Sequence, residues 1–120
     1  MFFNITNHPS ERWGAEQLQA AQQLGGDIVD IPFPAVAPEA TREEIGEMSE
    51  KLVSSLSLNE GDVALVQGEF TLVFSLVTRL KSRGVKAVAA TSSRLVTEVP
   101  AEDGTSKKEV TFKFVQFREY

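Results

Sequence analysis

Three residues in this 120-residue sequence could carry out chemistry on a bound ligand: His8, Ser10 and Glu69. His8 is the only histidine, and imidazole is the side chain that gains or loses a proton near neutral pH. Ser10 could begin a helix whose free N–H groups bind an anion, and the Glu69 carboxylate could accept a hydrogen bond from a ribose hydroxyl or an adenine amino group. Each residue also has a structural interpretation, because such side chains commonly stabilise turns and helix N-termini.

The segments that precede these residues predict where they lie. His8 and Ser10 follow the apolar start MFFNIT, and Glu69 follows the apolar run DVALVQG. In open parallel sheets a ligand binds outside the carboxyl ends of the strands, where the strand order reverses. We therefore expect the loops after the first, third and fourth strands to form the site. The further candidate ligand-binding residues in those loops are Asn7, Pro9, Arg12, Trp13, Gly68, Thr71, Thr91, Ser92, Ser93 and Arg94.

Four segments predict the strands of a parallel sheet. They are rich in apolar residues and bounded by turn residues, as expected for strands that are covered on both faces. The second also carries two prolines, which restrict it to a strand end or a sheet edge. The four segments are residues 1–6, 27–34, 62–68 and 85–94.

Three segments between these strands predict helices. The first would follow Ser10 as its N-cap and end at a pair of glycines. The second begins with a capping box formed by Thr41 and Glu44, and the third follows Glu69 and is apolar on nearly all sides. Alternating strands and helices predict an α/β fold, specifically a Rossmann-like three-layer sandwich whose mainly parallel sheet has the order 2-1-3-4.

The C-terminal part has a different pattern. Residues 95–99 and 109–117 alternate between apolar and polar side chains across a connection that contains the turn signal Asp103-Gly104, so they predict an antiparallel β-hairpin beside the sheet. Phe114 and Phe117 would lie on opposite faces, so either both faces are partly covered or a β-bulge resets the alternation. No linker or repeat interrupts the chain, and we expect residues 1–120 to form one domain.

The overall composition excludes several classes of function. A net charge of −5 argues against binding of long nucleic acid, which requires many contacts with phosphates, although a small anionic ligand could still enter a local pocket. The chain lacks cysteine, which removes disulfides and cysteine-bound zinc and fits a reducing compartment. No signal peptide or membrane span is predicted. We expect a cytoplasmic protein without a membrane partner.

Motifs for common enzymes are also missing. The sequence has no phosphate-binding P-loop, no dinucleotide-binding glycine fingerprint, no nucleophile elbow and no histidine pair for zinc, so kinases, dehydrogenases, hydrolases with a catalytic triad and zinc enzymes are disfavoured. We expect no metal and no cofactor.

The whole pattern resembles the CRISPR-associated Rossmann fold (CARF) family, in particular its small stand-alone members, which resemble ring nucleases. Three stretches carry the resemblance: the polar loop TNHPS after the first strand, the loop QGEFT that leads into a helix, and the hairpin formed by LVTEV and EVTFKFVQF. Together they cover nearly the whole chain, and the likeness lies in the arrangement of strands, loops and helices. The resemblance implies a homodimer whose two ligand-facing edges form one pocket for a cyclic oligoadenylate.

The resemblance also implies roles for the candidate residues. A ribose 2′-hydroxyl would attack the adjacent phosphate without a metal ion, which would switch off type III CRISPR antiviral signalling. His8 would be the general acid that protonates the leaving oxygen, and Ser10 with nearby N–H groups would hold the phosphate. Glu69 and Thr71 would hold the ribose or the base. Arg94 would supply positive charge.

Three alternatives belong to other classes. A binding module of the same fold could sequester or sense a small nucleotide without cleaving it. A small nucleoside N-glycoside hydrolase or transferase could use Glu69 as nucleophile or acid. A receiver-like or purely structural domain is the third alternative, but the first loop lacks the acidic pair with which a receiver binds magnesium.

Overall fold

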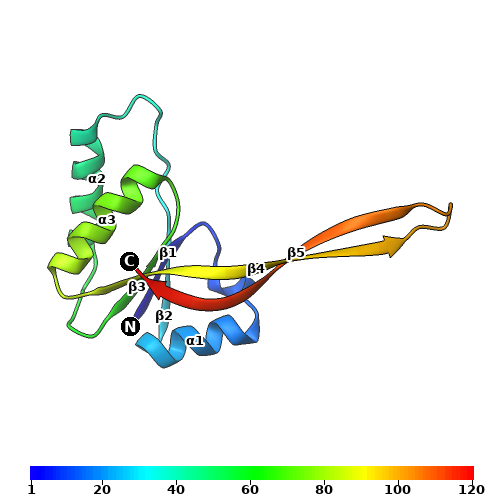
Figure 1. Ribbon diagram of the computed structural model, residues 1–120. Helices are drawn as coiled ribbons and strands as arrows, with labels where there is room; N and C mark the ends of the chain where they lie inside the picture. Colours follow the sequence, from blue (N-terminus) through cyan, green and yellow to red (C-terminus); the bar gives the residue numbers. More distant parts are fainter.

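The computed structural model describes residues 1–120 and shows an α/β fold with one mixed five-stranded sheet and three α-helices. The strands lie in the order β2-β1-β3-β4-β5, with β5 antiparallel to β4 and the other neighbours parallel. Figure 1 shows the helices on both sides of the sheet. The elements are β1 (Phe2–Thr6), a 3-10 turn η1 (Ser10–Arg12), α1 (Ala15–Gly25), β2 (Ile28–Pro32), α2 (Arg42–Ser55), β3 (Val63–Val66), α3 (Phe70–Ser82), β4 (Lys86–Pro100) and β5 (Ser106–Glu119).

The two faces of the sheet bury separate apolar clusters because strand side chains alternate between faces. Phe2 and Leu65 belong to the cluster under α1. Phe3 and Ile5 belong to the larger cluster under α2 and α3. Every residue of β1 and β3 is buried, as their continuous apolar runs predict. None of the helices combines the length and the apolarity that crossing a membrane requires.

The helix ends follow local sequence signals, with one exception. Thr41 and Glu44 form the expected capping box, and Gly26, with φ of 85°, ends α1. Ser10 is not the N-cap of α1, because α1 begins only at Ala15 with Gly14 as its N-cap. The Ser10 N–H and hydroxyl instead donate to the carboxylate of Asp30, and Trp13 has extended backbone between the 3-10 turn and α1.

The C-terminal hairpin is built differently from the expectation. A fourth strand with a separate hairpin was predicted, but β4 continues unbroken from Lys86 to Pro100 and pairs along its length with β5. The sheet order is therefore 2-1-3-4-5, not 2-1-3-4 with a hairpin added. Beyond Ser92 these two strands leave the sheet as a projecting ribbon, hereafter the arm (residues 92–114), and Figure 1 shows it extending away from the helices.

A β-bulge connects the arm to the sheet. Thr91 pairs with Gln116 and Ser92 pairs with Phe114, so the register skips Val115. The extra residue brings Phe114 and Phe117 to one side, with ring centroids 4.9 Å apart. Of the two alternatives that the sequence left open, the structure shows the β-bulge, which resets the alternation of side chains where the arm joins the sheet.

Candidate functional site

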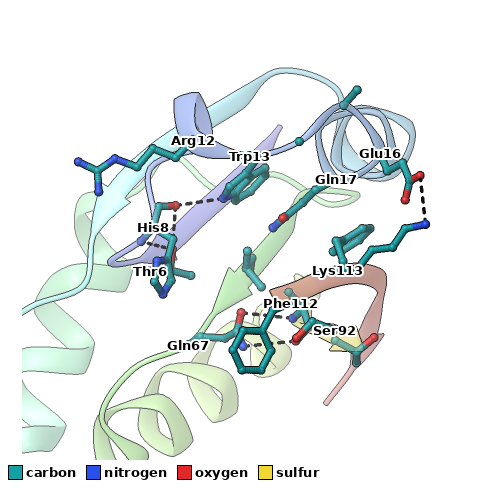
Figure 2. A pocket seen from close by; sticks show the side chains of 16 residues that line it. Thr6, His8, Arg12, Trp13, Glu16, Gln17, Gln67, Ser92, Phe112 and Lys113 are labelled. Atoms are coloured by element: carbon teal, nitrogen blue, oxygen red, sulfur yellow. Dashed lines mark hydrogen bonds and ion pairs between the residues drawn. The ribbon is translucent and has the colours of Figure 1, made fainter. Parts of the chain in front are cut away.

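A cavity of about 810 Å³ lies at the carboxyl ends of β1, β3 and β4, on the α1 side of the sheet. Its walls come from the loop after β1, the first turn of α1, the ends of β3 and β4, and the base of the arm (Figure 2). Five of the predicted site residues line it: His8, Arg12, Trp13, Thr91 and Ser92. The other lining residues are Thr6, Gly14, Ala15, Glu16, Gln17, Leu65, Gln67, Ala90, Phe112, Lys113 and Phe114.

The loop that carries His8 is held by two polar residues of β1. Asn4 is 1% exposed, and its Nδ2 donates to the His8 carbonyl at 2.9 Å and to Asp30 Oδ1 at 2.8 Å. The Thr6 hydroxyl donates to Asn4 Oδ1 at 2.8 Å and accepts from the His8 N–H at 3.0 Å. All hydrogen bonds of His8 are made by its backbone. The backbone is thus fixed while the imidazole remains available to a ligand.

Asp30 anchors the same loop from the neighbouring strand β2. Its carboxylate accepts from the Ser10 N–H at 3.1 Å and from the Ser10 hydroxyl at 2.9 Å. Burial acts to raise the pKa of Asp30, but the hydrogen bonds from Asn4 and Ser10 outweigh it, so the pKa lies below its usual value. The carboxylate is therefore ionised at neutral pH, and the Ser10 hydroxyl is engaged in the loop.

Replacing Asp30 with asparagine is expected to remove a pH-dependent part of the stability. Because the pKa of Asp30 is lowered on folding, its contribution is present above the usual carboxyl pKa and is lost as the pH falls through the lowered value. Thermal unfolding measured from neutral to acid pH should therefore show a smaller acid-side loss of stability for Asp30→Asn than for the wild type. If both proteins lose stability equally at acid pH, other carboxylates determine the acid-side loss of stability.

Aromatic side chains and a lysine complete the cavity. Trp13 donates from Nε1 to the His8 carbonyl at 3.2 Å, and its ring packs against Phe2 and Phe117 with centroids 6.2 Å from each. Phe112 is 70% exposed and stands at the arm side of the cavity, facing the Trp13 wall across the opening (Figure 2). Lys113 lies 4.0 Å from Glu16. The cavity can therefore offer aromatic surfaces and a cation to one ligand.

Arg12 lies at the rim of this cavity and Gln67 at its floor. The Arg12 side chain extends outward from the loop in Figure 2, so it can contact only the outer part of a ligand. The Gln67 amide exchanges hydrogen bonds with the backbone of Ala90, at 3.3 Å and 3.4 Å. Gln67 thereby extends the pairing of β3 with β4 beyond Val66 and holds the floor of the site.

Glu69 is not among the lining residues. It is the N-cap of α3, where its carboxylate accepts from the N–H and hydroxyl of Thr71 and from the Leu72 N–H. The hydrogen bond from the Thr71 side chain, followed by those from the Leu72 and Thr71 backbone, lowers the pKa of Glu69. His8 and Glu69 follow neighbouring strands as expected, but this cavity takes in only His8. The structure accounts for Glu69 as a helix cap.

None of the other predicted residues lines the cavity. Gly68 packs against the ring of Phe33, since a Cβ on Gly68 would lie 2.6 Å from three ring carbons. Thr71 lines a different hollow, of about 900 Å³ between α2 and α3. Asn7, Pro9 and Ser10 belong to the loop that Asp30 and Asn4 hold, and Ser93 and Arg94 belong to the arm. Arg94 pairs across the arm with Phe112 and so shares its face.

Several residues important to this geometry were not identified from the sequence. Asn4, Thr6 and Asp30 position the His8 loop, whereas Gln67, Phe112 and Lys113 line the cavity. A signal was present for Asn4, because an amide inside the apolar strand FFNIT must find hydrogen-bond partners. No signal marked the arm residues, since their approach to the cavity depends on the bulge. No cluster of three or more His, Asp or Glu side chains could hold a metal ion.

Comparison with known proteins gives a family without an assigned activity. The sequence model described as "Uncharacterized protein MJ1673 family" matches residues 1–118. No curated protein and no solved structure matches the chain.

Proposed function

The chain belongs to the MJ1673 family of uncharacterized proteins, and from the cavity at the strand ends we propose that it binds a cyclic oligoadenylate and cleaves it without a metal ion. The proposal treats the fold as a Rossmann-like three-layer sandwich of the CARF type. The observation that carries it is the convergence of His8, Trp13 and Phe112 on one cavity. Adenine rings can stack on aromatic side chains, and histidine is the side chain that most often acts as a general acid.

The proposed reaction is an internal transfer at one phosphate of the ring. The ribose 2′-oxygen attacks the adjacent phosphorus and loses its proton to solvent, a 2′,3′-cyclic phosphate forms, and the bond from phosphorus to the 5′-oxygen breaks. His8, in its protonated form, donates a proton to that 5′-oxygen as it leaves. Lys113 and the outward Arg12 offer positive charge to the phosphates. The protein's main contribution is then alignment, because the attacking and leaving oxygens must be in line.

The Ser10 hydroxyl has a supporting part in this proposal. It donates to Asp30 at 2.9 Å, so it holds the loop in place and does not itself carry a proton to the ligand. Glu69 likewise acts through α3, because its oxygens are occupied by Thr71 and Leu72. This engagement also disfavours an N-glycoside hydrolase that would use Glu69 as its acid, since the lowered pKa keeps the carboxyl ionised.

The proposed biological role follows from the resemblance to stand-alone CARF proteins. Degrading a cyclic oligoadenylate would end type III CRISPR antiviral signalling, and a ligand with rotational symmetry is suited to two identical subunits related by a two-fold axis.

Incubation with cyclic tetra- and hexa-adenylate in EDTA tests the function directly. We expect chromatography to show linear products that end in a 2′,3′-cyclic phosphate, with no free adenine. Measurable binding by calorimetry together with intact ligand would instead identify a non-catalytic binding module. Release of adenine would point to the N-glycoside reaction, and the absence of both binding and turnover would rule out the proposal.

A further inference from the structure

The outer edge of β5 is unpaired along the arm. β5 is the last strand of the sheet, and residues 106–113 are all exposed. A long exposed edge strand without proline is a template for pairing with another strand, and a two-stranded ribbon on its own is marginally stable in water. The arm nevertheless exposes large apolar side chains, namely Leu95, Val96, Val99, Val110 and Phe112. These features indicate a partner for this edge.

We propose that the partner is a second copy of the chain, whose β5 pairs antiparallel with the first across a two-fold axis between the two Thr111 residues. The stretch EVTFK, residues 109–113, is complementary to itself in this register. Glu109 lies opposite Lys113 of the partner subunit, and Val110 lies opposite Phe112 of the partner subunit. Each pair occurs twice by symmetry, and opposite charges and apolar pairs directly across strands are both favourable.

Neighbouring registers give less favourable cross-strand pairs than the register with its axis at Thr111. Two residues that lie opposite each other in an antiparallel pair must either both direct their N–H and C=O groups to the partner strand or both direct them away. In a symmetric pair, the two-fold axis therefore passes between two copies of the same residue. An axis at Val110 would place Lys107 opposite Lys113, and axes at Glu109 or Lys113 would place a charge opposite its own copy. An axis at Phe112 avoids repulsion but leaves Glu109 opposite Val115. The Thr111 register alone combines two ion pairs with no like charges opposite.

The pairing would also change the candidate site. Phe112 and Phe114 line the cavity, and in this register the partner subunit's Val110 and Lys108 lie opposite them. Since residues directly opposite share a face of the sheet, the aromatic walls of the two cavities would join across the axis, and a lysine of each copy would reach the rim of the other's cavity. The pairing itself is independent of the ligand. The contribution of Lys108 to the partner's cavity rests on the proposed function.

Charge reversal at the arm tests the pairing. Analytical ultracentrifugation of the whole chain should show a dimer, and Glu109→Lys should raise its dissociation constant by about tenfold or more, because two ion pairs become two repulsive pairs. The double variant Glu109→Lys with Lys113→Glu should restore dimerisation. A wild-type monomer, or a double variant no better than Glu109→Lys, would overturn the proposal. Glu109 pairs in its own chain with Thr97, so circular dichroism should show unchanged folding.

A cysteine scan tests the register separately. The chain has no cysteine, so Thr111→Cys introduces a single thiol that faces its own copy across the axis. Mild oxidation, or a short bis-maleimide, should then link most of the protein into covalent dimers. Thr97→Cys is the control, because Thr97 lies on β4 and pairs with Glu109 of its own chain, away from the proposed axis. Equal crosslinking of both variants, or none at Thr111→Cys, would contradict this register, and neither result depends on nuclease activity.

Discussion

His8→Ala is expected to lower the rate of cyclic tetra-adenylate cleavage by about 10²–10⁴-fold, the usual effect of losing a general acid, while ligand affinity stays close to that of the wild type. The reason is geometric, because only the backbone of His8 takes part in the internal hydrogen bonds. Removing the imidazole therefore leaves the loop in place and removes only the proton donor. Single-turnover cleavage and calorimetric binding, measured on the same preparation, separate these two effects.

Glu11→Gln is the matched control for this variant. Glu11 lies in the adjacent 3-10 turn, is exposed and does not line the cavity, so its replacement should change neither binding nor turnover. Unchanged turnover by His8→Ala would exclude His8 as the acid. Loss of binding in that variant would show instead that the imidazole holds the ligand.

The strand and helix pattern could be predicted from local sequence, because each signal acts within a few residues. The apolar runs of β1 and β3, the Thr41–Glu44 capping box and Gly26 at the end of α1 all have the predicted roles. The continuity of β4 could not be predicted in this way. The polar stretch TSSR predicts the end of the fourth strand and a loop after it, but its backbone continues β4 and pairs with β5, and a bulge at Val115 absorbs the change of phase.

The cavity contains only part of the predicted site, because strand order identifies an edge of the sheet and not a face. The loops after β1 and β4 contribute His8, Trp13 and Ser92 to the cavity, which lies on the α1 side. The chain after β3 leads through Glu69 into α3, which covers the opposite face. The face that a crossover helix takes depends on the handedness of the connection and on packing, so residue spacing alone could not decide that Glu69 would lie outside the cavity.

Asn4→Ala is expected to destabilise the fold by about 2–3 kcal/mol, because it removes three side-chain hydrogen bonds, one of them to a carboxylate, and hydrogen bonds to charged groups contribute most. Asn4 joins three segments through its side chain, since it bonds the His8 carbonyl, Asp30 and the Thr6 hydroxyl. Alanine would remove these three bonds and would open a small void beneath the loop, while the His8 carbonyl would still accept from Trp13 and Asp30 would still accept from Ser10. Urea unfolding of the variant and the wild type gives the difference directly.

Asn7→Ala is the matched control for the loss of stability in Asn4→Ala, because it also removes an amide side chain near this loop. Asn7 is exposed, so its replacement should stay within about 0.5 kcal/mol of the wild type. If Asn4 positions the acid, Asn4→Ala should also lower cleavage under conditions where the variant is folded, and should lower it no further when His8 is already alanine. Additive losses in the double variant would mean that Asn4 acts on the ligand by a route other than the His8 loop, and full activity in the single variant would limit Asn4 to holding the fold.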